Sequence, residues 1–542
     1  MAKLLYKLGN WAGSNSKKVI FSSILFIAVL AGITISMGTA FNEDVSIPGT
    51  ESEKAMKVLE DEFTDGEQAG QVYIVMKAQK NETLESEENN AAINKMLNEI
   101  KKDKNVVSVA TPTELGNINP DKQIGYAVVT YDSSAADVSE KSKERIEDSL
   151  KILQDQGLQT GLGGTVQFEV TKAGGGPGEI LGVCIAYAIL ALTFASFLVA
   201  GMPILTALIG LGFGILLILL GTNYFDISSI SLTLAGMLGL AVGIDYALFI
   251  FSRFKQQLKK GYSVQESIAI ANGTAGSAVV FAGITVIIAL LGLSVVNIPF
   301  ITAMGTATAV VVFFSIIVAT LVVPAILGLV GHRIKPERSN RFLLKLTRAN
   351  KKNEENTNKW GKFVTNHPVM ISLFGIALLV VMSIPFFHLN LGLPDNGNKQ
   401  YETAERKGYD LLSEAYGEGF HSTLVVIADP VNNSNATPEK LEALTMVISE
   451  LDHVKSVTPA MSNQNGDLFI MSVTPENGPN DPATKDVVKE IRDLSDKDSI
   501  ELLVTGSTAI NIDITEQIKD ALPTFALLIV VFAFVLMMVV FR

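Results

Sequence analysis

Long apolar runs alternate with two long polar segments along this chain of 542 residues. Each run is about 20 residues or longer, which is enough for a helix to cross the hydrocarbon core of a bilayer. The run at 300–330 is long for one span, and Pro324 near its end predicts a kink or an interfacial tail. The first run is interpreted as a retained span and not as a signal peptide, because a similar run lies in mid-chain. The pattern predicts a polytopic α-helical membrane protein with spans at 19–38, 179–198, 202–221, 227–251, 274–296, 300–330, 369–388 and 522–541.

The two polar segments, 39–178 and 389–520, combine short strand-type stretches with amphipathic helix-type stretches. Both follow the order β-α-β-β-α-β, which is the ferredoxin-like split βαβ pattern. We therefore expect two α+β domains of the same fold, packed side by side. The expected elements are 71–77, 86–103, 106–110, 124–130, 138–155 and 158–162 in the first segment, and 423–428, 438–451, 454–458, 467–473, 483–497 and 500–505 in the second.

The chain contains an internal repeat. The only two tryptophans, Trp11 and Trp360, each precede a predicted span by about eight residues, and the stretch at 108–112 (SVATP) resembles that at 456–459 (SVTP). The first copy has one span, a polar domain and five further spans, whereas the second has one span, a polar domain and one span. We therefore expect a second copy truncated after the eighth span. The expected divisions are 1–38, 39–178, 179–331, 332–367, 368–388, 389–520 and 521–542.

Charge predicts the orientation in the membrane. Residues 1–18 carry four lysines and no acid, and 331–367 carries ten basic residues against three acids. Short basic loops stay in the cytoplasm, so both acidic segments are expected outside the cell membrane. The net charge of −12 then belongs to the outer domains and gives no indication of nucleic-acid binding. The basic stretch at 332–367 is expected to be a cytoplasmic linker with a surface helix around 339–349, which either touches anionic lipid or serves only as an orientation signal.

The sequence contains none of three common motifs for nucleotide binding, metal binding or redox chemistry. There is no P-loop, no HExxH and no CxxC motif, the five histidines are scattered, and Cys184 is the only cysteine. No disulfide, cofactor or metal is therefore expected, and the chain is not expected to be an enzyme. An ion gradient is then the expected source of energy for any transport.

Asp245 is the single ionisable acid in the apolar run 227–251 and is followed directly by Tyr246. A carboxylate at bilayer depth costs roughly 2.5–3.5 kcal/mol on insertion scales, so such residues usually mark an ion or proton path. The alternative is a hydrogen bond that only holds helices together, but such bonds average about 0.6 kcal/mol. The Tyr246 hydroxyl is able to donate to a carboxylate or accept from a carboxyl. The pair is the candidate proton relay, each member meeting a partner on a neighbouring helix.

Small and aromatic residues surround the candidate relay in the sequence. Gly236, Gly239 and Gly243 lie at i, i+3 and i+7, which is typical of close helix packing. With the second copy incomplete, we expect this glycine face to meet lipid. Phe249 lies one turn from Asp245, as a core or lipid-facing residue or as a hydrophobic gate.

The stretch at 243–249 (GIDYALF), followed by 252–254 (SRF), resembles the fourth-helix motif of MmpL-type transporters of the resistance-nodulation-division (RND) superfamily. The layout of span, outer porter domain and five spans matches that family over 1–331, and its second copy over 360–542. The resemblance implies proton-driven export of lipids or other hydrophobic molecules, with Asp245 and Tyr246 as half of the relay and Phe249 at the gate position. Relatives carry a second Asp-Tyr pair, which this sequence lacks, and Ala282 stands where many have a hydroxyl, so Thr285 is the candidate replacement.

The partners implied are membrane lipids, a hydrophobic substrate and protons, with a second polypeptide supplying four helices and a homo-oligomer as further candidates. The loops are typical of a Gram-positive host. Two alternatives remain: a non-transporting scaffold or accessory protein, and a protein-export assistant similar to the SecD/SecF family. With a half-relay, this chain alone is expected not to transport.

Overall fold

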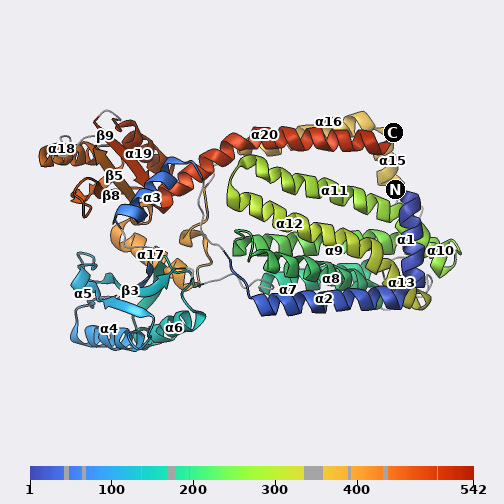
Figure 1. Ribbon diagram of the computed structural model, residues 1–542, viewed down its shortest axis with the longest axis horizontal. Coiled ribbons are helices and arrows are strands. Elements are labelled where there is room, and N and C mark those ends of the chain that lie inside the picture. The colour runs from blue at the N-terminus through green and yellow to red at the C-terminus, as the bar shows by residue number, and fades with distance from the viewer. Residues whose placement is uncertain are drawn as a thin grey trace. The chain divides into compact units, whose positions relative to one another are not determined.

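The computed structural model divides the chain into two compact units (Figure 1). The helical unit comprises residues 1–45, 171–389 and 520–542, and the sheet unit comprises 46–170 and 390–519. The structure describes residues 1–41, 48–63, 69–135, 137–168, 177–194, 196–334, 358–388, 392–430, 437–496 and 499–541. The surface helix expected around 339–349 lies outside these residues.

Seven described helical segments are long and apolar enough to cross a membrane, which confirms the expected polytopic helical membrane protein. An eighth apolar segment, Ile180–Thr193, is shorter and falls on the predicted run 179–198. The helices of this unit are α1 (Ala2–Ser14), α2 (Ser16–Met37), α7 (Pro177–Phe194), α8 (Phe197–Gly221), α9 (Ser229–Lys259), α10 (Val264–Ala271), α11 (Ser277–Leu291), α12 (Pro299–Ile317), α13 (Val323–Val330), α15 (Asn358–Asn366), α16 (Pro368–Ser383) and the later part of α20 (Ser507–Phe541).

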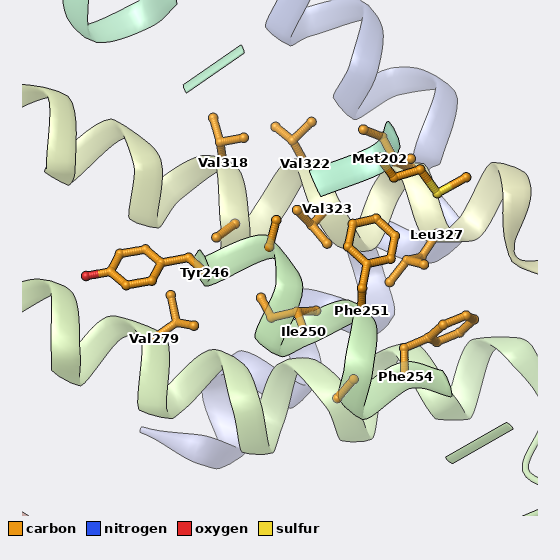
Figure 2. Packing of buried hydrophobic residues seen from close by; sticks show 14 of the residues in the cluster. Met202, Tyr246, Ile250, Phe251, Phe254, Val279, Val318, Val322, Val323 and Leu327 are labelled. Carbon is orange, nitrogen blue, oxygen red and sulfur yellow. The ribbon is translucent and has the colours of Figure 1, made fainter. Parts of the chain in front are cut away.

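The core of the helical unit forms where α8, α9 and α12 pack against one another. Side chains of α9 interdigitate there with those of the segment 318–327 (Figure 2). That segment begins as a π-helix, η3 (Val318–Val322), directly before Pro324 in α13. Proline removes one backbone donor, and the wider turn of a π-helix accommodates that loss, so the structure has a π-helical segment beside the residue where a kink was one of the two expectations.

A second π-helix, η1 (Asn272–Gly276), joins α10 to α11. The buried amide of Asn272 donates from Nδ2 to the Leu5 carbonyl at 2.8 Å and to the Thr320 carbonyl at 3.1 Å. It therefore ties α1 and η3 to η1. A buried amide with such partners is stabilising, whereas its loss would leave backbone carbonyls without donors.

The first sheet of the sheet unit has four antiparallel strands in the order β2-β3-β1-β4. Residues alternate between its two faces, and one face is covered by helices α4 and α6, with Met96, Ile100, Ile146 and Leu153 in the core. The elements are β1 (Ala69–Lys77), α4 (Glu87–Ile100), β2 (Val106–Ala110), α5 (Pro112–Leu115), β3 (Ile124–Ser134), α6 (Glu140–Asp155) and β4 (Gln159–Gly164).

The second sheet has the corresponding order β6-β8-β5-β9, with the short β7 paired to β8. Its core contains Ile448, Val488 and Ile491 from two helices that follow β5 and β8. The elements are β5 (Leu424–Pro430), α18 (Pro438–Ser449), β6 (Val454–Val457), β7 (Met461–Ser462), β8 (Phe469–Pro475), α19 (Pro482–Asp493) and β9 (Ile500–Thr505).

Each half of the chain lends a helix to the sheet of the other half. Helix α3 (Glu51–Phe63) precedes the first sheet in sequence but packs on the second, through Ala55 and Leu59. Helix α17 (Ala404–Tyr416) precedes the second sheet but packs on the first, through Leu411 and Leu412. The other face of each sheet is thus covered by an element from the opposite half. The sequence analysis predicted neither helix.

Candidate functional site

Asp245 lies in the middle of α9 and is the only acidic residue of that helix. Its side chain is on the exposed side of the helical unit. No hydrogen bond or ion pair joins it to another described residue. The structure therefore places the one carboxylate of this apolar helix on an outward face.

Tyr246, the next residue, lies about 100° further around the helix, faces the core and is 6% exposed. Its ring lies beside Val279 of α11, with Ile250 one turn away (Figure 2). The phenolic oxygen is buried and has no hydrogen-bond partner among the described residues. A buried hydroxyl without a partner costs about 1–3 kcal/mol, and most buried polar groups in proteins have a partner.

Gly283 of α11 makes room for this hydroxyl. A Cβ built at Gly283 would lie 3.2 Å from the Tyr246 Oη and would overlap the side chain of Ile316. Position 283 thus requires glycine for close packing among α9, α11 and α12. The sequence analysis did not single out this residue, although it stands directly after Ala282 in a run that was compared with the family pattern.

Phe249 and Thr285 do not join Tyr246 in the core cluster. Phe249 is 63% exposed, one turn from Asp245 on the outward side of α9. Thr285 donates its hydroxyl to the Phe281 carbonyl of its own helix at 3.0 Å. Neither residue therefore contacts the Tyr246 hydroxyl through a hydrogen bond.

The three glycines of α9 differ in their surroundings. A Cβ at Gly239 would overlap Val311 of α12, and one at Gly243 would lie 3.0 Å from Ala207 of α8, whereas Gly236 has nothing within 4 Å. The expectation that this face meets lipid is therefore wrong for Gly239 and Gly243. Helices α8 and α12, which come from the same half of the chain, already occupy the close-packing surface.

Beyond Asp245, α9 is linked to η1 by a polar contact that sequence patterns did not indicate. The Nε of Arg253 lies 3.3 Å from the Thr274 hydroxyl, and one terminal nitrogen donates to Gln256 at 3.0 Å. Arg253 therefore connects the helix of the relay candidates to the π-helical segment that holds Asn272.

The described residues contain no group of three or more His, Cys, Asp or Glu side chains arranged to hold a metal ion. Asp245 and Tyr246 place a single carboxyl group and a phenol next to each other in the sequence of an apolar helix.

Comparison with known proteins identifies the family of this chain. The chain matches the MMPL family over residues 44–371 and 399–542. It is 48% identical to the membrane protein YdfJ of Bacillus subtilis over 545 residues, covering 100% of this chain and 74% of YdfJ. It is 26% identical to the mycolic acid-containing lipids exporter MmpL11 of Mycolicibacterium smegmatis, covering 70% of this chain and 40% of that protein. The trehalose monomycolate exporter MmpL3 of the same organism is 22% identical, with 71% and 40% covered.

This chain thus spans about three quarters of YdfJ and less than half of the two exporters. The family match extends over both halves of the chain, including α9 with its Asp-Tyr pair. It confirms the resemblance that the motif at 243–249 indicated. The protein is a polytopic membrane protein that belongs to the MMPL family.

Proposed function

We propose that this protein is a transporter of lipids or other hydrophobic molecules across the cytoplasmic membrane, driven by the proton gradient. The names of MmpL11 and MmpL3 as exporters of mycolic acid-containing lipids and trehalose monomycolate support the substrate class. The proton as coupling ion is supported by a single observation, the lone carboxylate of Asp245 on the apolar helix α9 beside a buried tyrosine. One proton that crosses the membrane releases roughly 2.3 kcal/mol per 100 mV.

In this proposal Asp245 alternates between carboxylate and carboxylic acid. Protonation removes the charge and lowers the cost of placing the side chain against apolar surroundings. Because Gly239 and Gly243 hold α9 tightly against α12 and α8, a shift of α9 moves these helices as one body. Arg253 passes the movement to η1, where a π-helical turn is a natural place for a change in helical register.

Tyr246 has a positioning role in this scheme. Its ring lies in the core, and its hydroxyl lies beside Gly283 of α11. We propose that it offers a hydrogen bond to the proton path in one of the two states. Phe249, on the same outward side as Asp245, is the proposed gate residue.

We also propose that both α+β domains have the ferredoxin-like split βαβ fold and lie outside the membrane as porter domains. The matching strand orders of the two sheets support the fold. The excess of acidic over basic residues in 39–178 and 389–520 supports the location.

The test is Asp245→Asn in the complete transporter, reconstituted in vesicles with an imposed pH gradient. Asn has nearly the same shape but does not titrate, so proton flux and release of a fluorescent lipid should fall to background. Asp245→Glu, which keeps a titratable group, is the matched control and should retain part of the flux. Membrane insertion and thermal stability of both variants should equal those of the parent. Substrate-coupled proton flux at the parental rate in Asp245→Asn would overturn the relay.

A further inference from the structure

Helix α1 has two faces of different character. Leu5, Gly9 and Ala12, spaced at i, i+4 and i+7, are buried against the helical unit. Leu4, Lys7 and Trp11, spaced at i, i+3 and i+7, form a separate stripe that we call the outer stripe. In the outer stripe Leu4 is 72% exposed and Trp11 is 52% exposed.

The buried face of α1 packs across one end of the helical unit, beside α10 (Figure 1). Gly9 sits against Asn272, where a Cβ would lie 2.6 Å from that residue's Cβ. The Gln265 amide donates to Asn10 Oδ1 at 2.9 Å and to the Ser14 hydroxyl at 2.8 Å. These contacts fix which side of α1 faces outward.

Charge around the outer stripe is one-sided. Lys3 lies in the first turn of α1, and Lys17 and Lys18 lie in the first turn of α2, with no acid in either first turn. The N-terminal end of a helix carries a partial positive charge, so cations there are unfavourable unless anions lie nearby. None of these lysines, nor Lys7, forms an ion pair with a described residue. The described part of the chain therefore does not supply the anions.

Helix α1 lies at the end of a transmembrane bundle and exposes a tryptophan, a leucine and lysines. This combination is typical of helices at the membrane–water interface. Tryptophan favours that region, apolar side chains enter the acyl boundary, and lysines reach the phosphates. A purely topological role for the lysines would require their charge but not the apolar outer stripe beside them.

We propose that the outer stripe of α1 binds the headgroups of anionic phospholipids in the leaflet at this end of the bundle. The occupant is a lipid surface, with Leu4 and Trp11 at the acyl boundary and Lys3, Lys7, Lys17 and Lys18 at the phosphates. Through Asn272, which bonds both α1 and η3, such binding acts on the two π-helical segments.

The test uses the fact that the chain has only two tryptophans. In the full chain carrying Trp360→Phe, Trp11 is the only indole and reports on its own surroundings. This protein is reconstituted in phosphatidylcholine vesicles that contain 30% phosphatidylglycerol, with acyl-chain bromine on either the zwitterionic or the anionic lipid. At equal mole fraction of brominated lipid and low salt, we expect the anionic lipid to quench Trp11 at least about twofold more strongly.

Two comparisons separate headgroup binding from simple contact with the bilayer. In the Trp360→Phe protein, Lys3→Gln with Lys7→Gln should lower the preference, and 0.5 M NaCl added after insertion should remove it, because salt screens exposed charges. Lys54→Gln with Lys57→Gln, which removes two exposed lysines of α3, is the matched control and should keep the preference. Equal quenching by the two lipids would overturn the anionic-lipid proposal. No quenching by either lipid, with Trp11 shielded by a second protein or a second copy, would overturn the lipid surface as occupant.

Discussion

The two exchanged helices occupy equivalent places on two similar sheets and both pack through apolar side chains, yet their polar contacts differ in burial. Helix α17 lies on the first sheet by close backbone approach: Gly161 of β4 and Gly408 of α17 leave no room for a Cβ on either residue. Aromatic rings extend this contact, with Tyr126 of β3 at 5.9 Å from Tyr416 and 5.8 Å from Phe420, measured between ring centroids. Lys77 of β1 also pairs with Glu414 of α17 at 2.6 Å, but these side chains are 25% and 53% exposed, so apolar contacts contribute most to this interface.

Helix α3 packs on the second sheet through Ala55 and Leu59 and is joined in addition to a buried ion pair. Arg492 of α19 donates to both carboxylate oxygens of Asp513 in α20, at 2.7 and 3.0 Å, and the side chain of Asp513 is only 7% exposed. Asp513 in turn accepts from the Ser52 backbone N–H at 3.1 Å, at the start of α3. Both helices thus pack through apolar side chains, but only α3 is joined to a buried ion pair. The two helices should therefore respond to different perturbations.

The largest expected effect comes from Arg492→Met. It leaves the Asp513 carboxylate buried without its partner, which costs about 3–5 kcal/mol. Opening of α3 should therefore become at least about a hundredfold more frequent, measured as amide hydrogen exchange in the full chain. Helix α17 should keep its protection. The control is Lys102→Met, which breaks an exposed pair with Glu99 and should change stability by less than about 1 kcal/mol. Unchanged exchange in α3 would show that the ion pair does not hold it.

A smaller effect, on the other helix, is expected from Gly161→Ala. The added methyl group would overlap the backbone of Gly408, and overpacking of this kind costs about 1–3 kcal/mol. Amide exchange in α17 should accelerate while α3 stays protected, the reverse of the first experiment. The matched control is Gly163→Ala two residues away, where the new Cβ would lie 3.6 Å from Leu412, an ordinary contact. If both alanines loosened α17 equally, close backbone approach at Gly161 would not be the cause.

The smallest expected effect concerns pH and His421. This residue follows Phe420 in the 3₁₀ helix Glu418–Ser422, and its ring stacks on Tyr409 of α17 at 3.6 Å between centroids. Burial lowers the pKa of His421 below 6.5, although its contact with the Tyr409 carbonyl opposes this. The unfolded chain then binds the proton more readily than the folded one, so stability falls as pH drops through 6.5.

Exchange in α17, corrected for its intrinsic pH dependence, should therefore be faster at pH 5 than at pH 7.5. In His421→Gln, which does not titrate, the difference should disappear. Helix α3 provides the internal reference, because His421 stacks on rings of the α17 region. A pH response of equal size in the variant would assign the effect to another group.

The order of strands and helices within each sheet region followed from alternation and amphipathic spacing, which report on local burial. Each predicted strand has a counterpart, for example 106–110 in β2 and 500–505 in β9. The partner of an amphipathic helix is not a local property. The apolar stripes of α3 and α17 show that one face is buried, but not that the sheet lies in the other half of the chain.

The candidate site shows the same division. Asp245 and Tyr246 stood out because an acid in an apolar run is costly wherever it packs. Gly283 and Asn272 did not stand out, since their roles depend on Ile316 and Tyr246 in one case and on Leu5 and Thr320 in the other. The glycine face was misjudged for a related reason: the pattern indicated close packing but not that α8 and α12 provide it.

Because the helices are exchanged, each sheet and the helix that covers it are synthesised at different times. The first sheet is complete in sequence at β4, but its cover, α17, is translated about 250 residues later, which at 5–20 residues per second is roughly 12–50 s. During that interval Val75 and Ile124 have no Leu411 and Leu412 to bury them. Helix α3 waits longer still for the second sheet. A nascent chain of this protein therefore leaves one apolar face of the first sheet uncovered while the five long apolar helices described between β4 and α17 are synthesised, and exposed apolar surface of this kind favours misassembly.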